Sequence, residues 1–114
     1  MNTSTAVKVF ESLSSAIRLD IYRLLVKRGP SGMVAGEIGA ALDIPPTNLS
    51  FHLKSLVRAG LATVAQEGRY QRYRPDLATM RDIVVFMTEE CCAGAPANCS
   101  EVGEAMSALE RTRC

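Results

Sequence analysis

The sequence contains no tryptophan and a single histidine, and its first 90 residues contain no cysteine. Its longest run of large apolar side chains, Ile83 to Met87, is far too short to cross a bilayer. The first ten residues, MNTSTAVKVF, lack the basic-then-apolar pattern of a signal peptide. These absences predict a cytoplasmic protein with no membrane partner, in a compartment where thiols stay reduced.

The composition and the charge distribution indicate the kind of partner. The 114 residues, 47% hydrophobic and 22% charged, suit one soluble globular domain with a modest core. The net charge of +1 hides an asymmetry: residues 1–75 carry +5 and residues 76–114 carry −4. A basic body with an acidic tail fits a polyanionic partner for the first part of the chain.

Hydrophobic periodicity predicts three helices in the first 42 residues. We expect the first from about Thr5 to Leu13, and a second that is capped by Ser14 or Ser15 and stopped by Gly29-Pro30. A short third helix ends near Leu42. The apolar positions at helical spacing in these segments are Val9, Phe10, Leu13, Ile17, Ile21, Leu24, Leu25, Ile38 and Leu42.

A fourth helix is predicted from Pro46 to about Ala59, with Gly60 as its C-terminal cap. Two short helices joined by the turn at 43–45, the second polar on its free face, make a helix-turn-helix. The side chains of this fourth helix that are expected to face the core are Leu49, Leu53, Leu56 and Val57.

The next segments predict a hairpin and a long last helix. Residues 61–66 and 70–74 are strand-like around a turn at 67–69. Asp76 can cap a fifth helix that continues towards Glu90, and residues 101–112 can form a weak final helix.

The start of the second helix in a helix-turn-helix meets base edges in the major groove. An asparagine there can bond adenine, hydroxyls can bond bases or phosphates, and phenylalanine can contact a thymine methyl. His52 would donate to a phosphate or a base, although it also fits an ordinary surface or half-buried histidine. The predicted DNA-contacting positions in this helix are Thr47, Asn48, Ser50, Phe51, His52 and Lys54.

The hairpin adds three further candidates for DNA contact. Arg69 lies at its tip, and Arg72 and Arg74 lie on the returning strand. Arginines in this position can lie along the DNA backbone or reach into the minor groove, although they also fit a solvated strand face.

Residues 10–76 resemble the ArsR family of winged-helix repressors, which are dimeric bacterial regulators that respond to metals and metalloids. The resemblance rests on SLSSAIRLDIYRLL in the second helix, NLSFHLKSLVRAGL in the fourth and EGRYQRYR in the hairpin. It implies a mainly α, winged helix-turn-helix fold with a β-hairpin wing. It also implies a homodimer, joined through the first and fifth helices, on double-stranded operator DNA.

One departure from the family pattern concerns sulfur. Many arsenic sensors of the family carry Cys-Val-Cys-Asp-Leu at the start of the third helix, where this chain has VAGEI at 34–38. Any thiol chemistry must therefore lie in the tail. We expect residues 1–92 to form the DNA-binding and dimerisation domain, and residues 93–114 to form a C-terminal tail that completes the thiol site.

Three cysteines within nine residues predict a site for a soft ion. Cys91 and Cys92 are adjacent, which makes them poor disulfide partners, and the short loop before Cys99 can turn back to the pair. Three thiolates without histidine suit trivalent arsenic, with antimony also possible and no organic cofactor expected. Some ArsR-type repressors similarly carry a C-terminal Cys-Cys pair with a third cysteine nearby.

The predicted function is a non-enzymatic repressor that holds its operator when metal-free and releases it on binding As(III). Neighbouring residues on a helix point about 100° apart. Joint coordination by Cys91 and Cys92 would therefore distort the end of the fifth helix and change the spacing of the two DNA-reading helices.

Other interpretations of the cysteines stay open. Zinc or cadmium would need Cys114 or Glu89/Glu90 as a further ligand, and Cys114 is most simply a free terminal thiol. A redox sensor would form a Cys91–Cys99 or Cys92–Cys99 disulfide, and a tail that recruits another protein would ignore arsenite. An arsenate reductase of the phosphatase-like kind needs Cys-x5-Arg, which none of the cysteines begins.

Overall fold

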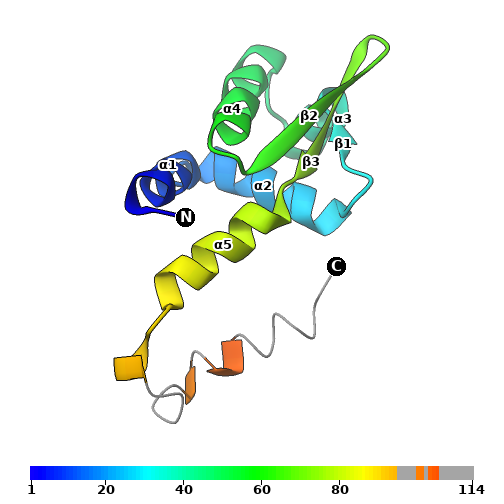
Figure 1. Cartoon of the computed structure of the whole chain (residues 1–114). Helices are drawn as coiled ribbons and strands as arrows, with labels where there is room; N and C mark the ends of the chain where they lie inside the picture. Colours follow the sequence, from blue (N-terminus) through cyan, green and yellow to red (C-terminus); the bar gives the residue numbers. More distant parts are fainter. Residues whose placement is uncertain (95–99, 102, 106–114) are drawn as a thin grey trace.

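The computed structural model describes residues 1–94, 100–101 and 103–105. Its helices surround a small sheet, the β2–β3 hairpin projects from one end, and α5 leads away from the body of the domain (Figure 1). The predicted mainly α fold with a β-hairpin wing is confirmed. The elements are α1 (Thr3–Leu13), α2 (Ala16–Arg28), β1 (Met33–Val34), α3 (Ala35–Leu42), α4 (Pro46–Arg58), β2 (Ala62–Glu67), β3 (Tyr70–Pro75), α5 (Leu77–Thr88) and a 3₁₀ helix, η1 (Cys92–Gly94).

Side-chain caps set the starts of three helices. The Asn2 side chain accepts a hydrogen bond from the Thr5 amide at 2.8 Å, so α1 begins two residues earlier than expected. Ser15 caps α2 and Asp76 caps α5 in the same way. Local polar chemistry therefore fixes where these helices begin.

The helix-turn-helix comprises α3, the turn after it and α4. Asp43 ends α3 in the left-handed region, with φ of 54°, and Pro46 opens α4 at a position that needs no amide hydrogen. At the end of α4, Gly60 has φ of 78° and the Leu61 amide donates to the Leu56 carbonyl at 3.0 Å. This is a glycine-centred C-terminal cap, as predicted.

The sheet has the order β1–β3–β2, with both pairings antiparallel. Sequence analysis did not predict β1, whose Met33 pairs with Tyr73. The loop before β1 runs so close to β3 that a Cβ on Gly32 would overlap the Tyr73 carbonyl. β1 therefore attaches the wing to the body of the domain.

The core draws side chains from the helices α1 to α5 and from the sheet. The fully buried ones include Val9, Ile21, Leu25, Ile38, Leu53, Leu56 and Leu61. Two expected core positions were wrong, because Phe10 is 46% exposed and Ile17 is 40% exposed. Val9 on α1 is buried, as its spacing indicates, whereas Tyr22 on α2 is buried although it was not among the expected positions.

Helix α5 ends at Thr88, two residues before the predicted end at Glu90. The Thr88 hydroxyl donates to the Val84 carbonyl at 2.7 Å, and Glu90 adopts the left-handed region with φ of 56°. The described part of the predicted final helix, residues 101 and 103–105, is helical, and so is residue 100. The remainder of that prediction lies outside the described residues.

Candidate nucleic-acid interface and thiol region

The free face of α4 carries most of the predicted DNA-contacting side chains. Leu49, Leu53 and Leu56 anchor the opposite face in the core, being at most 4% exposed. Phe51 is 67% exposed, and its ring lies edge-on to that of His52 with the centroids 5.6 Å apart. The exposed positions are Thr47, Asn48, Ser50, Phe51 and Lys54.

His52 lies to one side of this face and is half-buried. Its Nδ1 lies 3.1 Å from a guanidinium nitrogen of Arg18, which can only donate, so Nδ1 is the acceptor. Burial, and to a lesser extent the charge of Arg18, lowers the pKa of His52. The neutral ring therefore keeps its proton on Nε2, which is the one nitrogen left for the predicted DNA contact.

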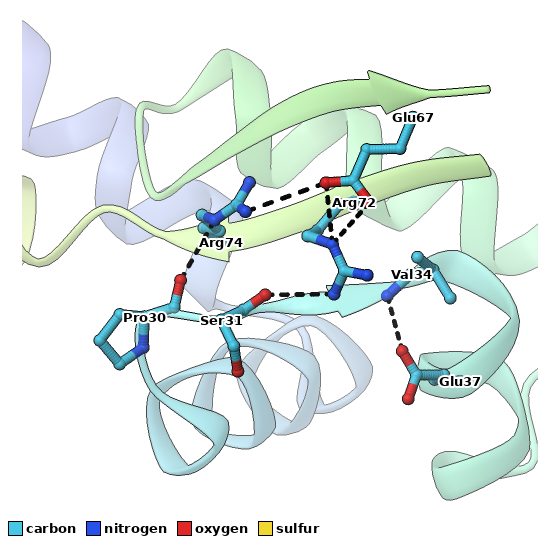
Figure 2. Close-up of polar contacts among 7 residues, drawn as sticks. All are labelled: Pro30, Ser31, Val34, Glu37, Glu67, Arg72 and Arg74. Atoms are coloured by element: carbon cyan, nitrogen blue, oxygen red, sulfur yellow. Dashed lines mark hydrogen bonds and ion pairs between the residues drawn. The ribbon is translucent and has the colours of Figure 1, made fainter.

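Two of the three wing arginines are held by groups within the domain (Figure 2). Nε of Arg72 lies 2.9 and 3.0 Å from the two carboxylate oxygens of Glu67, and one of its terminal nitrogens donates to the Ser31 carbonyl at 3.1 Å. Arg74 donates to the Pro30 carbonyl at 3.1 Å and lies 3.9 Å from Glu67. These arginines tie the hairpin to the loop before β1, a role that sequence analysis missed.

The tip of the wing is more open. Arg69 is exposed and forms no ion pair within the part of the chain that the structure describes. Tyr70 beside it is 59% exposed and pairs with Glu67 to close the hairpin. Tyr70 was not predicted as a site residue, although its place directly after the turn could have indicated it.

The predicted thiol site falls largely outside the described residues. Cys91 is half-exposed in the turn after α5, Cys92 opens η1, and Cys99 and Cys114 are not among the described positions. Among the residues that are described, no three His, Cys, Asp or Glu side chains are placed to hold a metal ion. The cysteine triad stays a prediction.

The backbone corrects one premise of the predicted mechanism. The Cys91-Cys92 pair follows α5, which has already ended at Thr88, so no helical geometry separates the two residues. Positive φ angles at Glu90 and Ala93 flank the pair. The two cysteines therefore do not lie on the last turn of α5, as the predicted mechanism assumed.

No helix in the described ranges combines the length and the apolar character needed to span a membrane.

Comparison with known protein families and relatives points to transcription factors. Residues 13–65 match the family model described as a helix-turn-helix domain. An uncharacterised HTH-type transcriptional regulator, YceK, from Bacillus subtilis (strain 168) is 36% identical over 62 residues. That match covers 54% of this chain and 61% of the relative, so it spans less than two thirds of the relative's length.

Solved structures show the same fold. An ArsR-like transcriptional regulator from Rhodococcus sp. RHA1 matches with a TM-score of 0.67 at 23% identity, covering 95% of this chain and 92% of that one. A homodimeric winged helix-turn-helix DNA-binding domain from Mycobacterium bovis, described as a possible ArsR-family regulator, matches with a TM-score of 0.61 at 26% identity. This match covers 78% of this chain and 82% of the Mycobacterium bovis chain. Together these likenesses show that the chain has the winged helix-turn-helix fold found in ArsR-type transcriptional regulators.

Proposed function

Starting from this ArsR-type winged helix-turn-helix, we propose that the chain is a non-enzymatic cytoplasmic repressor. It binds operator DNA as a homodimer and releases it when Cys91, Cys92 and Cys99 capture As(III) or Sb(III). The observation that carries the DNA-binding half is the exposed face of α4, from Thr47 to Lys54, beside a wing with an exposed Arg69 at its tip.

The α4 face has the chemistry that sequence-specific DNA binding needs. Asn48 and Ser50 offer hydrogen bonds to base edges, and the exposed ring of Phe51 suits a thymine methyl. Lys54 and Arg69 offer positive charge to the phosphates, which supplies affinity without sequence preference. The leucine face of α4 holds this surface rigidly against the core.

Homodimer formation is supported by apolar side chains that the single chain leaves exposed. On α1, Val7 and Phe10 are each 46% exposed, and on α5, Val85 is 45% and Met87 62% exposed. Helix α5 also extends away from the body of the domain (Figure 1). Burying these side chains against a second copy would place two α4 helices on successive half-sites, about 34 Å apart.

The thiol half of the proposal rests on donor chemistry. Three sulfurs can replace the three hydroxyls of arsenite and form a neutral cluster, which avoids the cost of burying a charge. The turn at Glu90–Cys91 leaves the first cysteine half-exposed directly after α5. Because α5 belongs to the proposed dimer interface, ligation next to its last turn would alter the spacing of the two α4 helices.

Selection from a random duplex pool followed by fluorescence anisotropy tests the DNA-binding half. Asn48→Ala should reduce discrimination between selected and scrambled duplexes, whereas Arg69→Ala should weaken both alike. Lys27→Ala, in the last turn of α2, removes the same charge elsewhere and serves as the control. Failure to enrich any sequence, or equal loss of discrimination in Asn48→Ala and Arg69→Ala, would refute the assignment.

X-ray absorption on the arsenite-loaded protein under reducing conditions tests the thiol half directly, because it counts the sulfurs around arsenic. We expect three sulfurs in the wild type and two in Cys99→Ser. Cys114→Ser should keep all three and is the matched control. Oxygen-only coordination, or no retention of arsenic at micromolar concentration, would refute arsenic sensing and leave DNA binding untouched.

A further inference from the structure

A polar pocket of about 300 Å³ lies where α1 and α2 meet the C-terminal half of α4. Figure 1 shows these three elements side by side. The pocket shares only Arg18, which holds His52, with the interface described above. Its lining includes Lys8, Glu11, Ser12, Arg18, Ser55 and Arg58.

The floor of the pocket is a fixed hydrogen-bonded group. The hydroxyls of Ser12 on α1 and Ser55 on α4 lie 3.1 Å apart, and Ser12 is only 4% exposed. Nε of Arg18 donates to the Ser12 carbonyl at 2.6 Å, which fixes the guanidinium at one edge of the pocket. The floor is therefore preorganised and needs no rearrangement to receive a ligand.

The charge of the pocket is not neutralised from within the domain. Three of the lining side chains are cationic and one is acidic, which leaves the lining at +2. Within the described residues none of the four forms an ion pair. His52, the other partner of Arg18, adds no charge when its ring is neutral. Unpaired positive charge in a concave surface concentrates anions.

We propose that this pocket binds a phosphate group, held between Arg58, Lys8 and the Arg18 guanidinium. Guanidinium groups match phosphate oxygens in a forked geometry, and hydroxyls can donate to the remaining oxygens. The group comes either from the backbone of bound DNA or from free phosphate in solution. The DNA source rests on the proposed function, whereas the free-phosphate source does not.

A phosphate in this pocket connects the two functional surfaces of the protein. It contacts α1, which belongs to the proposed dimer interface, and α4, which carries the DNA-contacting face. Occupancy therefore fixes the position of α4 relative to α1.

Two titrations on the full chain test the proposal. The double variant Lys8→Ala/Arg58→Ala changes side chains that are exposed and form no ion pair among the described residues, so it should fold normally by circular dichroism. Lys27→Ala is the single-charge control. In the first titration, binding of inorganic phosphate is followed by the NMR shifts of the Ser12 and Ser55 amides. A titration with chloride at equal ionic strength is the reference. In the second, duplex affinity is measured over a range of salt.

Free phosphate as the ligand predicts saturable shifts at Ser12 and Ser55, with affinity roughly tenfold weaker in the double variant, on the scale of one charged hydrogen bond. Backbone phosphate predicts roughly tenfold weaker binding to every duplex and a salt dependence that is reduced by about one phosphate contact. The proposal is overturned if both effects are absent, or if Lys27→Ala produces effects of the same size. Failure of the wild type to bind any duplex would refute the proposed function and leave the inorganic phosphate titration decisive.

Discussion

Arg18 on α2 donates a hydrogen bond to Nδ1 of His52 on α4, across 3.1 Å. The same guanidinium donates to the carbonyl of Ser12 at the end of α1. One side chain therefore joins three helices, and the bond to α4 exists only while Nδ1 of His52 is free of a proton. Protonation would replace an acceptor by a second cation beside Arg18.

The first prediction concerns the pH dependence of stability. Burial and Arg18 lower the pKa of His52 from its ordinary 6.5, so the unfolded state takes up the proton first as the pH falls. The free energy of unfolding should be highest above pH 6.5 and should decrease as the pH falls below it. His52→Gln keeps a possible acceptor but cannot titrate, so its stability should change less between pH 7.5 and 5.5.

Urea unfolding at pH 7.5, 6.5 and 5.5 measures this difference. Arg18 is the charged group that acts on the pKa of His52 among the described residues. If the free energy of unfolding changes equally with pH in the wild type and in His52→Gln, the histidine does not control the pH dependence of stability.

The second prediction uses two buried tyrosines. The Tyr22 hydroxyl is buried without a hydrogen-bond partner among the described residues, and burial together with Asp76 raises its pKa to about 12. Tyr73 is also buried, but its hydroxyl donates to the Gln71 side chain at 3.1 Å. Tyr22→Phe should leave stability unchanged or raise it by about 1 kcal/mol, whereas Tyr73→Phe should lower it by about 1 kcal/mol. Urea denaturation that ranks the two variants in the opposite order would contradict this assignment.

The third prediction concerns the charge of the wing. Glu67 neutralises Arg72 and lies close to Arg74, so Glu67→Gln should free positive charge for DNA. Binding to a scrambled duplex should tighten and depend more steeply on salt, while stability should change by less than about 1 kcal/mol. Asp82→Asn, which removes an acid from an exposed ion pair on α5, is the control. Weaker binding by Glu67→Gln in anisotropy would mean instead that Glu67 positions the arginines for DNA.

The fourth prediction concerns dimer formation. Phe10→Asp places a charge among the exposed apolar side chains of α1 and should yield a monomer, because the charge would have to be buried in the interface. Phe51→Asp, an equally large change at an exposed phenylalanine on α4, should stay dimeric. Light scattering coupled to size exclusion distinguishes the two species. A dimeric Phe10→Asp would place the interface elsewhere.

Features set by local chemistry were predictable from the sequence. The leucine stripe of α4, the glycine cap at Gly60 and the aspartate cap at Asp76 each depend on residues within one or two helical turns. The exposed α4 face follows from the same periodicity, since fixing Leu49 and Leu53 inward places Asn48 and the residues around it outward.

Features that depend on distant partners were not predictable. Strand β1 has two residues, too few for any periodicity, and exists because Met33 meets Tyr73. Likewise Arg72 is held by Ser31, 41 residues away in the chain. Hydrophobic spacing also does not show how deeply each apolar side chain is buried, so Phe10 and Ile17 could not be distinguished from core residues.

The most direct test of the account is operator affinity with and without arsenite, measured by anisotropy under reducing conditions for the wild type and Cys92→Ser. Coupling between the thiol site and DNA predicts that arsenite weakens wild-type binding by roughly five- to 150-fold and leaves Cys92→Ser unaffected. Two results would contradict this coupling: wild-type operator affinity that stays unchanged while arsenic is bound, or operator affinity of Cys92→Ser that falls with arsenite as much as that of the wild type.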